Sequence, residues 1–125
     1  MLEDEVLARH SQRDGLDLAV LATARWLGLP GVRVRAVSER LGLSDRQLLR
    51  RFRVAVGYGP KTLDRVLRFQ RFLARAGAVA TDDESLARLA LELGYSDQAH
   101  LTRECVRLSG LTPGRLAHAR ARRPT

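Results

Sequence analysis

Residues 90–113, with the sequence ALELGYSDQAHLTRECVRLSGLTP, decide the fold that is expected of the chain. The pattern predicts a helix that ends at Leu93, because Gly94 readily adopts the left-handed conformation that closes a helix and that other residues resist. Ser96 and Asp97 come next, and both residue types are favourable N-caps. One helix is therefore expected to end, and another to begin, within a short turn.

The second helix of this stretch is predicted to cover residues 97–109, counting its N-cap. Gly110 ends it, and Thr112 with Pro113 starts a further helix, because Thr caps well and Pro is favourable in the first helical position. Two short helices joined by a tight turn that contains glycine form a helix-turn-helix. In such a motif the second helix usually enters the major groove of DNA.

The same pattern occurs earlier in the chain, at residues 38–60, which read SERLGLSDRQLLRRFRVAVGYGP. The offset between the two copies is 52 residues before the turn (Leu41 to Leu93) and 53 after it (Leu48 to Leu101), so the second turn has one extra residue. Two copies are too few for a solenoid, but they suit a tandem reader of double-helical DNA.

These residues resemble the DNA-binding domain of the AraC/XylS transcriptional regulators of bacteria. The strongest matches are Gly94-Tyr95-Ser96-Asp97-Gln98, Leu101-Thr102-Arg103 and Gly110-Leu111-Thr112-Pro113, and the resemblance extends over residues 16–116. It implies an all-α fold of about seven helices, in which two helix-turn-helix subdomains are joined by a long linker helix. It also implies sequence-specific binding of double-stranded DNA and regulation of transcription. The family usually has Phe where this chain has Cys105, so a smaller second core is expected.

The expected organisation has five parts. They are an N-terminal tail or short helix (1–15), a first helix-turn-helix subdomain (16–59), a linker helix (60–77), a second helix-turn-helix subdomain (78–120) and a basic C-terminal tail (121–125). A linker helix of this length would span roughly 25 Å. That length is compatible with two recognition helices placed about one turn of DNA apart, ~34 Å.

The first recognition helix is expected over residues 44–56, and the second over 97–109. In the first, four residues recur at i, i+3, i+4 and i+7 and so share one face, and the 53-residue offset gives the second helix a corresponding face that is much less basic. The full set of expected DNA-binding residues is Arg46, Gln47, Leu49, Arg50, Arg53, Gln98, Ala99, His100, Thr102 and Arg103. A solvated charged face is the alternative interpretation of the arginines. Residues expected in the core are Trp26, Leu48, Phe52, Val56, Leu101, Cys105 and Leu108.

Composition agrees with a polyanionic partner. Lys and Arg number 22 against 14 Asp and Glu, which gives the 125-residue chain a formal net charge of +8. Lys61 is the only Lys, and arginine pairs bidentately with phosphate and with guanine. An Arg-rich composition also arises from codon usage in a GC-rich genome, so the bias towards arginine adds little by itself.

The sequence offers no constellation for catalysis, for a metal or for a cofactor. His10, His100 and His118 are too scattered for a helical zinc pair, and Cys105 is the only Cys. There is no phosphate-cradling GxxxxGK loop, no apolar run of membrane-spanning length and no signal peptide. The chain is therefore expected to be cytoplasmic and not an enzyme.

Two other classes of function compete with sequence-specific DNA binding. One is a protein-interaction module that contacts the transcription machinery, with RNA polymerase as the candidate partner and DNA contact secondary. The other is a DNA alkylation-repair methyltransferase with an AraC-type domain, whose zinc site needs additional cysteines that this chain lacks. The chain has no evident domain for a small-molecule ligand. Whether it is a stand-alone regulator or a detached DNA-binding part stays open.

Overall fold

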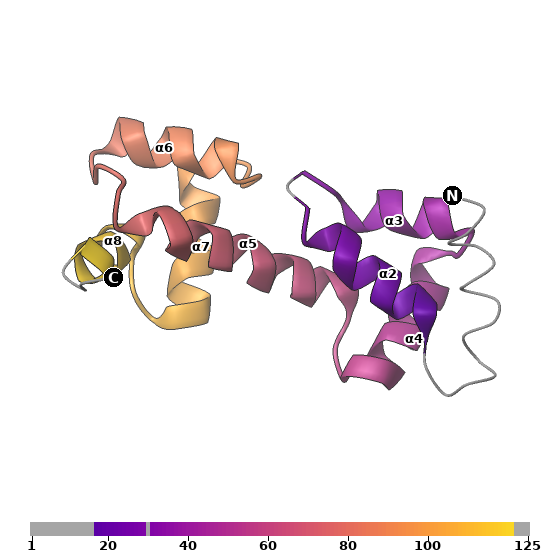
Figure 1. The fold of residues 1–125 in the computed structure, drawn as a ribbon. Helices are drawn as coiled ribbons and strands as arrows, with labels where there is room; N and C mark the ends of the chain where they lie inside the picture. Colours follow the sequence, from indigo (N-terminus) through magenta and orange to yellow (C-terminus); the bar gives the residue numbers. More distant parts are fainter. Residues whose placement is uncertain (1–16, 30, 122–125) are drawn as a thin grey trace. The chain divides into compact units, whose positions relative to one another are not determined.

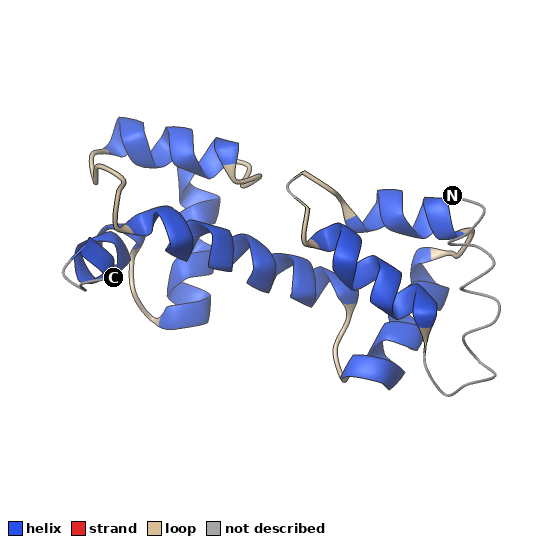
Figure 2. Cartoon of the chain, in the orientation of Figure 1, coloured by secondary structure: helices blue, strands red, loops and turns tan. Residues whose placement is uncertain are grey.

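The computed structural model describes residues 17–29 and 31–121. Within these residues every regular element is an α-helix and no strand occurs, which confirms the predicted all-α fold (Figure 1 and Figure 2). The described helices, seven as expected, are α2 (Leu18–Leu27), α3 (Val34–Leu41), α4 (Asp45–Val56), α5 (Pro60–Ala76), α6 (Asp83–Glu92), α7 (Gln98–Ser109) and α8 (Pro113–Ala121). The expected N-terminal tail or short helix at residues 1–15, and residues 122–125 of the expected basic tail, lie outside the described residues.

The chain forms two compact units, Met1–Asp64 and Arg65–Thr125, which we call unit 1 and unit 2. The boundary between them falls inside α5, the predicted linker helix. Unit 1 contains the helix pair α3–α4, and unit 2 contains the pair α6–α7. The finer subdomain boundaries expected from the sequence stay predictions.

In unit 1, α2 packs against both helices of the α3–α4 pair. Leu48 and Phe52 are fully buried, as predicted for the inner face of α4. The prediction for Val56 is wrong, since 42% of this residue is exposed. Val56 is the last residue of α4, and Gly57 directly after it is the C-cap, so the apolar period continues past the end of the surface that covers the helix.

Trp26 near the end of α2 is half-buried, so its expected place in the core is only partly right. The guanidinium of Arg40 lies over the indole, with the Arg40 Cζ atom 5.1 Å from the ring centroid. A cation over an aromatic face is a favourable contact that does not require the ring to leave the surface. Trp26 therefore joins α2 to α3 at the edge of the core.

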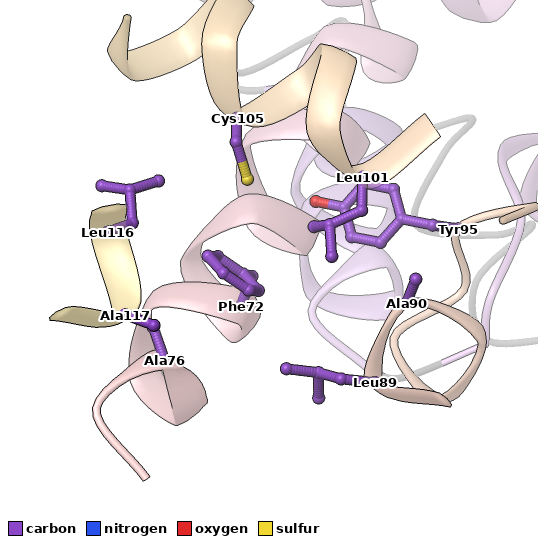
Figure 3. Packing of buried hydrophobic residues seen from close by; sticks show 9 residues of the cluster. All are labelled: Phe72, Ala76, Leu89, Ala90, Tyr95, Leu101, Cys105, Leu116 and Ala117. Carbon is purple, nitrogen blue, oxygen red and sulfur yellow. The ribbon is translucent and has the colours of Figure 1, made fainter. Parts of the chain in front are cut away.

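The core of unit 2 gathers side chains from all of its helices around Phe72 of α5 (Figure 3). Its buried members are Phe72, Ala76, Leu89, Ala90, Tyr95, Leu101, Cys105, Leu116 and Ala117. Leu101 and Cys105 are fully buried, as predicted. Leu108 is 38% exposed, so that prediction is wrong, and the reason is the same as for Val56: it lies in the last turn of its helix.

The ends of the helices follow from local chemistry. Ser44 caps α4 in a reciprocal capping box with Gln47, and Asp97 caps α7. Asp82 caps α6, which begins at Asp83. Asp83 and Glu84 are favourable there because acidic side chains stabilise the first turn of a helix.

Candidate nucleic-acid interface

One face of α4 presents the predicted basic surface, which we call the first reading face: Arg46, Leu49, Arg50 and Arg53. The three arginines are exposed, and no hydrogen bond or ion pair within the described part of the chain holds any of them. Leu49 is half-buried and packs on Gly59, where an added Cβ would lie 2.6 Å from the Leu49 Cδ1 atom. The face therefore combines three available guanidinium groups with one apolar side chain that is already packed.

The corresponding face of α7, the second reading face, consists of Ala99, Thr102, Arg103 and Val106. Ala99, Arg103 and Val106 are exposed, whereas Thr102 is half-buried. Arg103 has no hydrogen bond or ion pair among the residues that the structure describes. The second face thus carries one guanidinium where the first carries three, as the sequence offset predicts.

Two of the residues expected to bind DNA, Gln47 and Gln98, already have hydrogen-bond partners near the starts of α4 and α7. The Ser44 N–H donates to Oε1 of Gln47 at 2.8 Å, which completes the capping box of α4. The Gln98 Nε2 atom donates to Oδ1 of Asp83 at 3.2 Å. These hydrogen bonds hold the two amide side chains against the protein. To contact a base, either side chain would have to change its rotamer or use the amide atom that is not already bonded.

His100 has the most partners of the predicted site residues. The Ser96 N–H donates to its Nδ1 atom at 3.1 Å, and the edge of the Tyr95 ring meets the imidazole with 5.1 Å between centroids. Its Nε2 atom lies 3.9 Å from Oε1 of Glu104. His100 therefore holds the turn between α6 and α7 together, a role that the sequence analysis did not assign to it.

Helices α4 and α7 each carry one member of a largely buried ion pair that the sequence analysis did not single out. In unit 1, Arg51 of α4 donates two hydrogen bonds to the carboxylate of Asp17, Nε to Oδ2 at 2.8 Å and Nη2 to Oδ1 at 2.9 Å. In unit 2, Glu104 of α7 accepts two from Arg65 of α5, both at 2.7 Å. The hydrogen bonds of Arg65 hold the pKa of Glu104 below its usual value, and Glu104 raises the pKa of Arg65. The sequence does contain a hint of these pairs, because Arg51 and Glu104, which are opposite in charge, occupy the same position in the two copies of the repeat.

Two titratable side chains of unit 2, Cys105 and Tyr95, are buried in its core. Burial raises the pKa of the Cys105 thiol to about 12 and also raises the pKa of Tyr95. No group of His, Cys, Asp and Glu that would hold a metal occurs within residues 17–29 and 31–121, and His10 lies outside them. None of the described helices is long and apolar enough to cross a membrane.

Comparison with known proteins gives two matches. Residues 37–119, more than half of the chain, match the sequence profile of a family described as a helix-turn-helix domain. The chain is also similar to the crystal structure of a probable AraC family transcriptional regulator from Rhodopseudomonas palustris CGA009, with 22% sequence identity and a TM-score of 0.67. This similarity covers 85% of the present chain and 98% of that chain, and it shows the fold. No curated protein matches the chain significantly.

Proposed function

Because the chain belongs to the AraC/XylS family of DNA-binding transcriptional regulators, we propose that it reads specific duplex sequences with α4 and α7, each placed in a major groove. The first reading face carries this proposal. It offers Arg46, Arg50 and Arg53 to the solvent, while Leu48 and Phe52 bury the opposite side of the same helix. A helix with these two faces is stable without DNA and keeps its guanidinium groups for a ligand.

In unit 1, Arg46 and Arg50 are the proposed base readers, since a guanidinium pairs bidentately with O6 and N7 of guanine. Arg53 lies one turn further along and suits a phosphate contact. Gln47 acts chiefly by capping the helix, and Leu49 reaches a thymine methyl only with its outer edge. The overall charge of +8 adds an affinity for phosphates that does not depend on sequence.

In unit 2, Arg103 is the proposed base reader, and Ala99 and Thr102 offer methyl groups to thymine. Gln98 and His100 support the start of α7 through their hydrogen bonds with Asp83 and Ser96. With a single guanidinium on its reading face, unit 2 is proposed to add selectivity more than affinity.

The test compares Arg50→Ala and Arg103→Ala with the unchanged chain. Each variant is expected to lose about 1–3 kcal/mol of discrimination at the base that it reads, with the larger loss of total affinity for Arg50→Ala. The measurement is a titration with the preferred duplex and with a scrambled duplex, alongside a thermal melt that shows an intact fold.

Arg88→Ala is the matched control, because Arg88 is exposed on α6 and forms a surface ion pair with Glu84. Its replacement changes the net charge by the same amount as the two test variants. It is expected to leave sequence preference unchanged. If Arg50→Ala and Arg103→Ala behaved like Arg88→Ala, the proposed base readers would be wrong. If the unchanged chain bound all duplexes equally, sequence-specific reading itself would be refuted.

A further inference from the structure

The two ion pairs have the same geometry but opposite polarity. In each, an arginine uses Nε and Nη2 to bond both oxygens of one carboxylate. In unit 1 the cation, Arg51, is on the recognition helix and the anion, Asp17, is the N-cap of α2. In unit 2 the anion, Glu104, is on the recognition helix and the cation, Arg65, is on α5. The same position of the repeat is thus paired twice, with the charges exchanged.

Neither pair lies on a reading face. Arg51 comes five residues after Arg46, and Glu104 five residues after Ala99, so each projects about 140° around its helix from the start of the reading face. The side chains of Arg51 and Asp17 are 16% and 19% exposed, and those of Arg65 and Glu104 are 26% and 10% exposed. These groups therefore point towards the protein and act on any bound DNA only through the helix.

An ion pair with two hydrogen bonds at this position restricts the rotation of the helix about its own axis, which apolar packing restricts only weakly. Burial of Leu48 and Phe52, or of Leu101 and Cys105, is favourable but has little directional preference. Two parallel hydrogen bonds between a guanidinium and a carboxylate fix orientation as well as distance. At roughly 6 Å from the helix axis, a rotation of 20° moves a side-chain atom by about 2 Å, which is enough to break a base contact.

We propose that Arg51 and Glu104 are positioning residues that set the rotation of α4 and α7 about their own axes, through Asp17 and Arg65 respectively. This inference rests on the proposed function, because rotation matters only for helices that read bases. The need for a positioning residue is greater in unit 2. There Cys105 stands at the position that corresponds to the larger Phe52, so less buried surface holds the helix.

The experiment uses the full chain and the double variant R65M/E104M, which keeps the net charge. Replacing both partners of a buried pair by apolar residues is often neutral or stabilising, so the fold is expected to persist. The ratio of affinities for the preferred and scrambled duplexes is expected to fall by about tenfold or more, with the loss confined to the bases read by α7. If the Arg65–Glu104 pair had no role in positioning, R65M/E104M would show the same ratio of affinities as the unchanged chain, provided that the two proteins were equally stable to heat.

Charge reversal supplies the rescue. The variant R65E/E104R places the cation on the recognition helix, which is the polarity that unit 1 already uses, and it is expected to restore most of the ratio. The exposed pair Glu84 and Arg88 on α6 gives the control R88M/E84M, with the same types of residue removed and no expected change. If R65M/E104M did not fold, R65E/E104R would be the deciding variant. Folded R65E/E104R that prefers the same duplex as the unchanged chain supports positioning, whereas folded R65E/E104R without this preference refutes it.

The single variant Glu104→Gln separates positioning from simple electrostatics. Removal of a negative charge near DNA strengthens binding if only charge matters. Positioning predicts weaker binding to the preferred duplex together with equal or tighter binding to the scrambled one. Tighter binding to both duplexes would overturn the inference and leave the proposed function intact, whereas an unchanged chain without any preferred duplex would overturn both.

Discussion

At the scale of single residues, Cys105 is the simplest to test. Its side chain is fully buried in the core of unit 2, near Phe72 and Leu101 (Figure 3). Burial raises its pKa to about 12, so the thiol is protonated at neutral pH. Because the thiolate is the nucleophile, alkylation of native protein is expected to be at least about tenfold slower than alkylation of unfolded protein. The measurement is the labelling rate by iodoacetamide with and without denaturant, and similar rates would contradict a core role.

The residues that sequence analysis placed wrongly share one cause. Periodicity identified Leu48, Phe52 and Leu101 as buried, but it cannot show where the surface that covers a helix ends, so it also included Val56 and Leu108. An apolar spacing of three or four residues continues to the last turn of a helix whether or not another helix covers that turn.

The ion-pair partners of Arg51 and Glu104 could not be predicted from the sequence for a different reason. The Arg51–Asp17 pair joins residues 34 positions apart, and the Arg65–Glu104 pair joins residues 39 positions apart. Contacts over such distances depend on how the helices pack, and no local pattern encodes them. The charges at corresponding repeat positions were visible, but their partners were not.

At the scale of elements, helix boundaries were predictable because their chemistry is local. The glycines after α3, α4 and α7 adopt positive φ angles, as does Gly94 after α6, and each stands where the sequence suggested a stop. Asp97 and Asp82 cap the helices that they precede in sequence. The first turn of α6 contains two acidic residues, Asp83 and Glu84, which are favourable at the start of a helix.

Gly94 in the turn before α7 gives a test at this scale. Its φ angle is 92°, and an added Cβ would meet only the Arg68 Nε atom at 3.6 Å, an ordinary contact. Gly94→Ala is therefore expected to destabilise the protein by about 1–2 kcal/mol through backbone strain alone. Gly94→Asn is the matched variant and is expected to cost less, because Asn tolerates this conformation. Equal losses in denaturant unfolding would show that the side chain, not the φ angle, matters.

At the scale of the whole molecule, the duplication predicts a duplicated target. Selection from random duplex DNA is expected to return a bipartite motif, with half-sites about one helical turn, ~34 Å, apart. The half-site lost in Arg50→Ala should differ from the half-site lost in Arg103→Ala. A single contiguous motif, or the same half-site lost in both variants, would contradict reading by two helices.

The duplication was also what made the fold predictable. Two copies of one pattern, each with its glycine and N-cap, indicated two helix pairs, and the longer apolar and basic stretch between them indicated α5. The sequence could not rank the predicted contacts within each copy. That ranking needs the packed structure, in which Arg50 and Arg103 are exposed whereas Gln98 and His100 have partners.

The opposite polarity of the two ion pairs limits how the halves of this protein can be recombined. A chimaera that exchanged α4 and α7 would bring Arg51 against Arg65 and Glu104 against Asp17, with like charges facing each other in both places. Helices α4 and α7 are thus not interchangeable, although they occupy equivalent positions in the repeat. Grafting one of them elsewhere requires that its counter-ion be transplanted too.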